Sequence, residues 1–100
     1  MIYHMAAMLV IRERMVFEDG AVIEIKVWRL ENPVPASRHR LKYSLYYGQG
    51  GERLVGYDNE RGKGDHRHFG GREESYRFRS VERLLADFKT DVERLRGEKI

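Results

Sequence analysis

The stretch GYDNERGKGDHRHFGG, residues 56–71, holds the residue types that catalyse phosphodiester cleavage. His66 and His68 stand two residues apart, so an extended backbone points both imidazoles to the same side. Imidazole side chains serve as general base and general acid near neutral pH. In RNA cleavage one group takes the proton of the ribose 2′-hydroxyl, and the other protonates the leaving 5′-oxygen. The spacing therefore predicts an acid–base pair that needs no metal.

Charged neighbours complete this predicted site. Lys63 is placed to stabilise the charge that develops on the phosphorane, with Arg61 and Arg67 as alternatives. Asp58 or Asp65 is placed to orient an imidazole through its second nitrogen. The predicted catalytic set is His66, His68, Lys63, Asp65 and Asp58.

The excess positive charge falls in the same region. Residues 61–80 carry six basic and three acidic side chains, whereas basic and acidic residues balance in the rest of the chain. A local positive field attracts polyanions such as RNA. We therefore expect phosphate contacts and base stacking here, although core packing is the favoured alternative for Tyr57. The predicted nucleic-acid contacts are Arg61, Arg67, Arg72, Arg77 and Arg79, with Tyr57, Phe69 and Tyr76 as stacking residues.

Two other interpretations of the same stretch stay open. Asp65, His66 and His68, with Asp58, are a carboxylate–imidazole set of the kind that binds Zn, Mn or Fe. Three ligands within four residues strain the backbone, and the positive surroundings disfavour a cation, so we predict no metal and no cofactor. Alternatively, these residues cap turns in a hydrogen-bonded loop without chemistry. Gly62 and Gly64 let the backbone approach a phosphate, but their spacing fits neither a Walker loop nor the dinucleotide-binding fingerprint.

The elements that position this stretch follow from hydropathy and turn residues. Alternation predicts extended segments at residues 8–17, with Leu9 and Ile11 on one face, and at 21–30, 41–47 and 52–58. Asp19-Gly20 predicts a hairpin turn. Ser80 is a helix N-cap, an apolar stripe runs from residue 81 to 95, and Gly97 ends the helix. The fold class is α+β: an antiparallel meander of about four strands with a long C-terminal helix packed on one face. Residues 56–71 then form a loop between the last strand and the helix.

Two further surfaces follow from this fold. A single helix leaves one sheet face uncovered, so Trp28 and Tyr46 form either an aromatic patch or a second small core with the loop. Such a patch would suit a homodimer, a partner protein or RNA. Arg38, His39 and Arg40 form a second basic cluster, which we expect to be solvated.

Composition restricts the class of protein. One hundred residues suit one domain, residues 1–100, with residues 1–6 frayed. The absence of cysteine excludes disulfides, thiolate metal ligands and a thiol nucleophile, and suits a cytoplasmic location. The longest apolar run, residues 5–11, is far below the roughly 20 residues of a membrane span. We expect no signal peptide and no membrane contact.

Residues 57–78, YDNERGKGDHRHFGGREESYRF, resemble the signature of the TumE family of toxins. The flanking segments FEDGAVIEIKVWRLENPVPASRHRLKYSLYY and SVERLLADFKTDVERLR are similar to that family as well, so the resemblance covers residues 8–96. It implies the toxin half of a TumA/TumE-type, type II toxin–antitoxin module, paired with a DNA-binding antitoxin encoded beside it. Compact toxins of this kind often cleave mRNA, so the expected target is RNA or the ribosome. The alternatives are a growth inhibitor that binds without catalysis and a metal-dependent nuclease.

Overall fold

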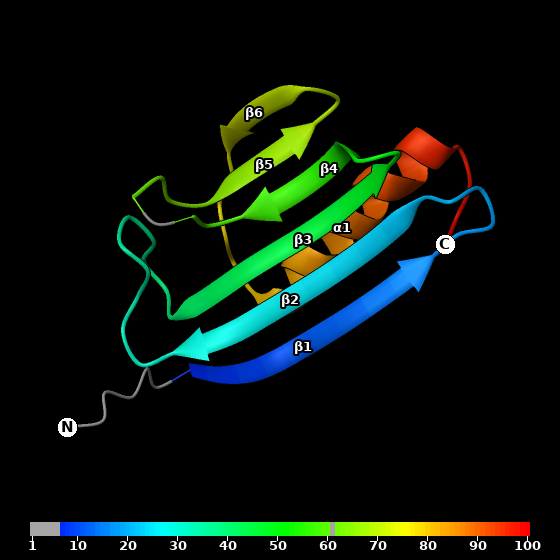
Figure 1. Cartoon of the computed structure of the whole chain (residues 1–100). Helices are drawn as coiled ribbons and strands as arrows, with labels where there is room; N and C mark the ends of the chain where they lie inside the picture. The colour runs from blue at the N-terminus through cyan, green and yellow to red at the C-terminus, as the bar shows by residue number, and fades with distance from the viewer. Residues whose placement is uncertain (1–6, 61) are drawn as a thin grey trace.

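The described residues form a single antiparallel sheet with one helix across it (Figure 1). The structure is a computed structural model and describes residues 7–60 and 62–100. The strands follow chain order across the sheet, so the α+β meander with a C-terminal helix is confirmed, but with six strands instead of four. The elements are β1 Ala7–Val16, β2 Val22–Leu30, β3 Leu41–Gln49, β4 Glu52–Asp58, β5 His66–Phe69, β6 Arg72–Ser75 and α1 Val81–Arg96. The predictions for residues 1–6 and for Arg61 lie outside the described residues.

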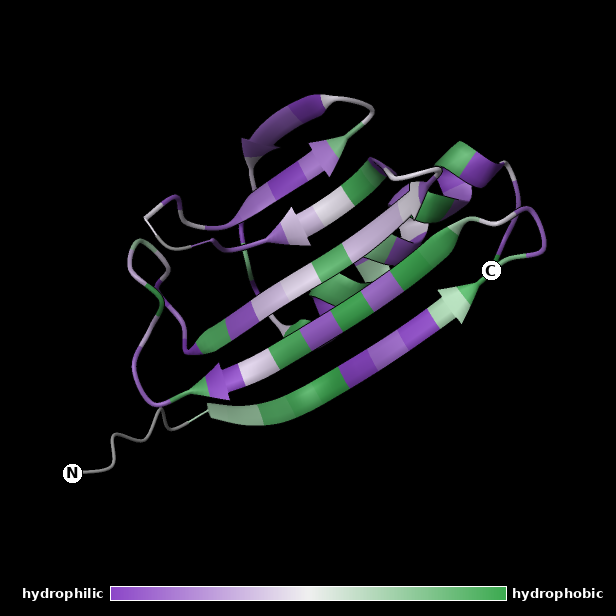
Figure 2. Ribbon diagram, in the orientation of Figure 1, coloured by the Kyte–Doolittle hydropathy of each residue, from purple (hydrophilic) through white to green (hydrophobic). Residues whose placement is uncertain are grey.

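The two additional strands lie where a loop was predicted. β5 and β6 pair through a turn at Gly70-Gly71, where both glycines have positive φ (56° and 84°). A two-residue turn of this kind suits the twist of a hairpin. Figure 2 shows that both strands are mostly hydrophilic, so they carry no hydropathy alternation that predicts a strand. Backbone pairing with β4, rather than apolar burial, makes this segment a strand.

The core lies between α1 and the sheet face that it covers. Alternate residues of β2 and β3 point to this face, and on β2 they appear as an alternation of green and purple in Figure 2. Ser80 caps the helix by accepting a hydrogen bond from the Arg83 N–H (3.1 Å), and Gly97 ends it at φ 71°. The described part of the chain contains no helix with the length and apolar character needed to cross a bilayer. The buried core residues include Ile23, Val27, Tyr43, Leu45, Tyr47, Val55, Tyr57, Leu84, Phe88 and Val92.

Strand β1 forms one edge of the sheet and contains an irregularity. Its register with β2 shifts between Leu9 and Ile11, so that Leu9 lies opposite Trp28 and Ile11 lies opposite Val27. Neighbouring residues of a strand point to opposite faces, and Val27 is buried under the helix. Leu9 therefore lies on the uncovered face, and the prediction that it shares a face with Ile11 was wrong. A β-bulge reverses the facing of the residues that precede it.

Candidate active site

The two histidines of β5 lie on the uncovered face of the sheet, which we call the open face. His66 pairs with Asp58 of β4 and Ser75 of β6, and His68 pairs with Gly56 and Glu73. Their side chains are 17% and 16% exposed. Both imidazoles point away from α1 because the residue between them, Arg67, points toward the helix. The same-side arrangement follows from the extended spacing, as predicted.

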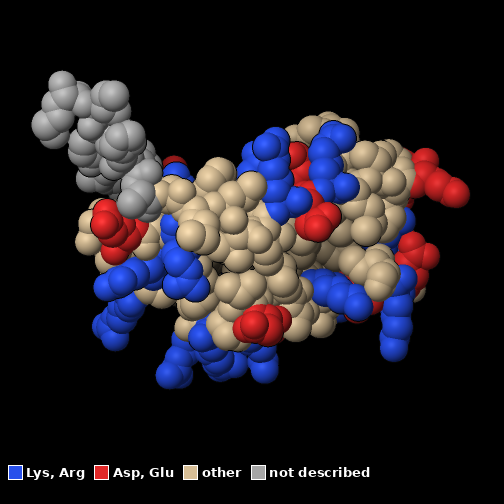
Figure 3. All heavy atoms as spheres, turned by 90° about the horizontal axis from the view of Figure 1, so that it is seen from below, with Lys and Arg blue, Asp and Glu red and all other residues tan. Residues whose placement is uncertain are grey.

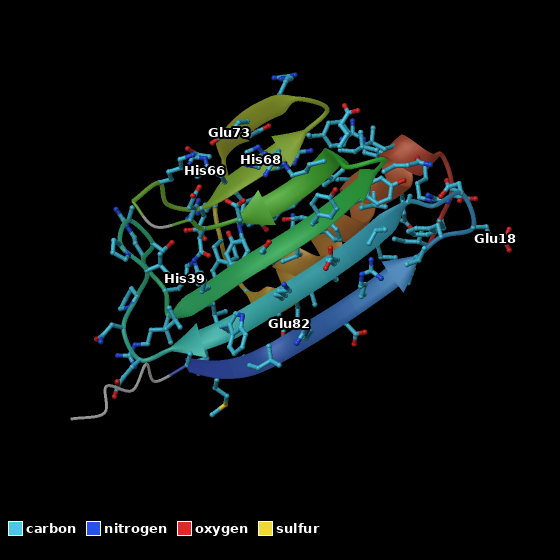
Figure 4. All side chains as sticks on the ribbon, in the orientation of Figure 1. Glu18, His39, His66, His68, Glu73 and Glu82 are labelled. Carbon is cyan, nitrogen blue, oxygen red and sulfur yellow. The ribbon has the colours of Figure 1, made fainter. Side chains whose placement is uncertain are left out.

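Glu73 lies between the two imidazoles. Its Oε1 is 3.3 Å from His66 Nδ1, and its Oε2 is 3.8 Å from His68 Nδ1. Figure 4 shows the three labelled side chains together over β5 and β6, with His39, Glu18 and Glu82 well apart from them. Glu73 reaches this position because the hairpin places it opposite His68.

Arg53 brings a cation to the same place from β4. Its Nη2 is 3.0 Å from His68 Nδ1, and its Nη1 is 4.0 Å from Asp58 Oδ2. Gly56 makes this position accessible, because a Cβ there would lie 2.8 Å from Arg53 Cδ and 3.6 Å from His68 Cδ2. Asp58 Oδ2 is in turn 4.0 Å from His68 Nε2. We call His66, His68, Glu73, Arg53 and Asp58 the open-face cluster.

The hydrogen bonds place a proton on Nε2 of both imidazoles, but only the Nε2–H of His66 is already bonded within the protein. A guanidinium only donates, so the bond from Arg53 makes His68 Nδ1 an acceptor and leaves the proton on Nε2. His66 Nε2 donates to the Lys63 carbonyl oxygen at 2.6 Å. His66 Nδ1 is buried and has no hydrogen-bond partner among the residues that the structure describes, although Glu73 Oε1 lies 3.3 Å from it. His68 is therefore the imidazole with a nitrogen available to a substrate.

Asp65 lies in a second cluster, away from His66 and His68. It accepts hydrogen bonds from the Ser37 hydroxyl (2.8 Å), the Tyr43 hydroxyl (2.7 Å) and His39 Nε2 (2.6 Å). His39 stacks on Phe78 with ring centroids 3.9 Å apart. Asp65 thus orients an imidazole, but that of His39, which the sequence did not place at the site.

This second cluster is not a nucleophilic triad, although it contains a serine, a histidine and an aspartate. The Ser37 hydroxyl donates to Asp65 and not to His39, and His39 Nδ1 accepts from the Leu41 N–H at 3.2 Å. No imidazole nitrogen is then available to activate the serine. Burial, followed by the hydrogen bond to Asp65, raises the pKa of Tyr43 and keeps its hydroxyl a donor. We assign the cluster to the stability of the long connection before β3.

A polar pocket of about 560 Å³ lies beside this cluster and collects several predicted RNA contacts. It is lined by Lys63, Tyr76 and Arg77, together with Arg38 and Asp65. Gly62 does not present a free N–H group here, because its N–H donates to the Pro35 carbonyl at 3.1 Å. The Lys63 N–H likewise donates to the Glu60 carbonyl at 3.1 Å. The Lys63 ammonium group pairs with Glu60 at 3.5 Å beside this pocket, so only the backbone carbonyl of Lys63 contacts a histidine of β5.

Arg67 and Tyr57 are held beneath α1. Arg67 Nε and Nη2 donate to the two oxygens of Asp91 at 2.7 and 2.8 Å, and the Tyr57 hydroxyl donates to the same carboxylate at 2.6 Å. Arg67 Nη1 also donates to Glu74 at 2.9 Å. The bonds to Asp91 raise the pKa of Arg67, and burial followed by the bond to Asp91 raises the pKa of Tyr57. Neither side chain faces the open surface, and Tyr57 packs in the core.

The remaining predicted contacts are dispersed. Phe69 lies between the guanidinium groups of Arg67 and Arg94, at 4.9 and 5.3 Å from its centroid. The Tyr76 hydroxyl donates to Asp87, while Arg72 and Arg79 are exposed.

Within residues 7–60 and 62–100 no three His, Cys, Asp or Glu side chains are grouped as metal ligands. The proposed metal set does not converge because Asp65 bonds to His39 instead.

Two members of the open-face cluster were not foreseen from the sequence. Glu73 can be found by treating Gly70-Gly71 as a hairpin turn, since that register places it opposite His68. Arg53 gives no such signal, because it precedes His68 by 15 residues and reaches it only through the β3–β4 and β4–β5 pairings.

Comparison with known proteins gives the family of the chain. A family model described as Toxin TumE matches residues 3–96. The chain therefore belongs to the TumE toxin family. It is accordingly a toxin of a toxin–antitoxin system, whose partner is a cognate antitoxin. No curated protein and no solved structure matched the chain.

Proposed function

We propose that the toxin is a metal-independent endoribonuclease and that the open-face cluster is its active site. The observation that carries the proposal is the grouping of a protonated imidazole nitrogen on His68, the carboxylate of Glu73 and the guanidinium of Arg53. The three side chains come from β5, β6 and β4, so the sheet pairing holds them in place. General acid, general base and cation are the groups that transesterification of RNA requires.

The reaction follows from these positions. Glu73 accepts the proton of the ribose 2′-hydroxyl, and the 2′-oxygen attacks the adjacent phosphorus. The bond from phosphorus to the 5′-oxygen breaks, and His68, as the imidazolium, gives its Nε2 proton to that oxygen and is left neutral. His68 takes up the second proton on Nδ1 when Arg53 turns from that nitrogen to the phosphate, with Glu73 Oε2 3.8 Å from the same nitrogen. Arg53 stabilises the negative charge of the phosphorane. The products are a 2′,3′-cyclic phosphate and a 5′-hydroxyl end, so neither water nor a metal ion enters this step.

His66 and Asp58 act as positioning residues in this scheme. His66 is anchored to the Lys63 carbonyl and lies 3.3 Å from Glu73 Oε1, so it fixes one side of that carboxylate. Asp58 lies 4.0 Å from both Arg53 and His68 and restrains the other side. This division of roles refines the expectation that both histidines exchange protons with RNA.

The open face supplies a path for single-stranded RNA. Register places Arg14, Glu24, Tyr46, Gly56, His68 and Glu73 in one row across the sheet, and Arg12, Lys26, Ser44, Asp58 and His66 in the next. Cations at the β1 end of both rows can contact phosphates, and Tyr46 can stack a base two strands from His68. The half-buried Tyr46 and Trp28 both lie on this face.

The test is cleavage of a labelled single-stranded RNA by the purified toxin in the presence of EDTA. We expect His68→Ala and Glu73→Gln each to lower the rate by roughly 10²- to 10⁴-fold. His66→Ala should lower the rate less and change its pH profile, as expected of a residue that acts through Glu73. The double variant His66→Ala with His68→Ala should also abolish growth inhibition in cells while retaining the circular dichroism spectrum of the parent.

Glu18→Gln is the matched control for Glu73→Gln. Glu18 is an exposed carboxylate in the turn before β2, at the far end of the molecule in Figure 4. Its substitution removes one negative charge without touching the cluster, so the cleavage rate should stay at the parent value. Equal rates for the Glu18 and Glu73 variants would refute the role of Glu73.

The same assay separates the alternative functions. Cleavage that appears only after addition of a divalent metal ion would favour a metal-dependent nuclease. Tight, salt-sensitive RNA binding with no cleavage under either condition would favour a growth inhibitor that blocks RNA or the ribosome. Product ends other than a 2′,3′-cyclic phosphate would exclude the transesterification written above.

A further inference from the structure

The outer edge of β1 offers a row of backbone groups for pairing. β1 is ten residues long and is the first strand in the sheet order, so within residues 7–60 and 62–100 only β2 pairs with it. An exposed edge of this length is a template for another strand. Proteins use such edges to bind an extended segment of a partner by strand addition.

The edge is bordered by exposed apolar side chains. Five apolar side chains of β1 are between 44% and 65% exposed: those of Met8, Leu9, Val10, Met15 and Val16. Figure 3 looks onto this edge from below and shows uncharged surface that basic and acidic side chains interrupt. On β1 itself the exposed charges are Arg12, Glu13 and Arg14, between the apolar residues of its two ends. Natural edge strands are usually short or heavily charged, so this apolar exposure indicates a surface that a partner covers.

A groove adjoins the edge on the helix side. It has a volume of about 400 Å³ and lies between β1, β2 and α1, with Met15, Ile23, Ile25, Leu85 and Phe88 among its lining residues. The groove exists because α1 crosses the sheet nearer β4 than β1 and leaves the end of the core open. Every second side chain of an added strand would enter this groove.

The charges in the centre of β1 disfavour a second copy of this chain as the occupant. A two-fold antiparallel pairing sets residues of the same face opposite one another. The symmetric registers centred on residues 12, 13 and 14 then oppose Arg12 to Arg12, Glu13 to Glu13 and Arg14 to Arg14. Like charges directly opposite one another destabilise a strand pair.

We propose that an extended segment of the cognate antitoxin adds to the sheet as a seventh strand along β1. Its residues on the groove side are apolar. Its residues on the open-face side include carboxylates that pair with Arg12 and Arg14, of which Arg14 has only a 4.0 Å contact with Glu24. The proposal rests on membership of the toxin family and does not depend on the nuclease mechanism.

Calorimetric titration of the cognate antitoxin into the full-length toxin tests this surface. The charge-reversed pair Arg12→Glu with Arg14→Glu, and separately Met15→Glu, should each weaken the affinity by at least about tenfold. The positions are exposed, so the thermal midpoint of the free toxin should stay close to that of the parent. Arg72→Glu on β6 and Leu95→Gln on α1 are the matched controls, because they change an exposed cation and an exposed apolar residue elsewhere, and both should bind as the parent does.

Amide hydrogen exchange of the unmutated complex gives a second, independent measurement. The antitoxin should slow exchange along β1 and leave β6 unchanged. Parent-like affinity of both β1 variants, or unchanged exchange along β1, would overturn the proposal. It would equally be overturned if the toxin alone were a dimer in light scattering and the β1 substitutions made it a monomer, since a second copy would then occupy the edge.

Discussion

Removal of the Asp91 carboxylate tests whether Arg67 is a structural residue or an RNA contact. Asp91 accepts two hydrogen bonds from Arg67 and one from Tyr57, and its side chain is 6% exposed. Asp91→Ala therefore leaves a largely buried guanidinium with Glu74 as its remaining acidic partner. Breaking a buried pair in this way costs about 3–5 kcal/mol. Because the Arg67 side chain is 21% exposed and keeps its bond to Glu74, we expect about 3 kcal/mol.

The loss is large compared with the total stability of a small protein, which is about 5–15 kcal/mol. Equilibrium unfolding in urea measures it as a shift of the midpoint at an unchanged slope. Tyr57→Phe should cost about 1.5 kcal/mol, because Asp91 keeps both bonds from Arg67. The control Glu82→Ala removes an exposed carboxylate from the same helix and should cost less than about 1 kcal/mol.

A double-mutant cycle makes the reasoning refutable. If Arg67 and Asp91 act as a pair, Arg67→Met combined with Asp91→Leu should destabilise less than the sum of the two single changes. A loss below about 1 kcal/mol for Asp91→Ala, with additive effects in the cycle, would show a solvated pair. Arg67 would then be free to bind phosphate, as the sequence suggested, and the fixed orientation of His66 and His68 would need another cause.

Three further predictions concern stability. Burial raises the pKa of Tyr43 and of Tyr57 above the usual 10.0, so both stay protonated in the folded state but ionise in the unfolded chain. Their contribution to stability should be constant below pH 10 and fall above it, by about 1.4 kcal/mol per pH unit for each, and the phenolate absorbance of these two residues should appear only as the chain unfolds in alkali. Asn59→Ala should lower the free energy of unfolding in urea by about 2–4 kcal/mol, because it leaves the Tyr43 N–H and the Leu41 carbonyl unpaired in the interior. Parent-like stability would mean that water replaces the amide. Ser80→Ala should lower the free energy of unfolding by about 1 kcal/mol in the same measurement, because it removes the side chain that caps the helix. Ser80→Asn should lower it little, since asparagine is also a good N-cap. If both variants lost the same free energy, capping would not be the cause of the loss.

Local patterns were enough to predict the frame of the fold. Asp19-Gly20 forms the predicted turn, with Gly20 at φ 87° and its N–H bonded to the Phe17 carbonyl at 3.0 Å. Ser80 and Gly97 bound the helix as predicted. These features depend on a few neighbouring residues, so composition and spacing determine them. β5 and β6 were missed because they are short, polar and held by backbone pairing, which leaves no periodicity in the sequence.

The sequence by itself therefore determined the α+β class, the helix and the same-side spacing of His66 and His68. Only the tertiary structure decided which charged residues accompany them. Arg53 meets His68 across 15 positions, His39 meets Asp65 across 26, and Arg67 meets Asp91 across 24. Such contacts depend on strand register and on the face that each residue takes. A shift of one position exchanges the faces of a strand, so arginines and aspartates that look equivalent in the sequence end up either in the interior or on the open face.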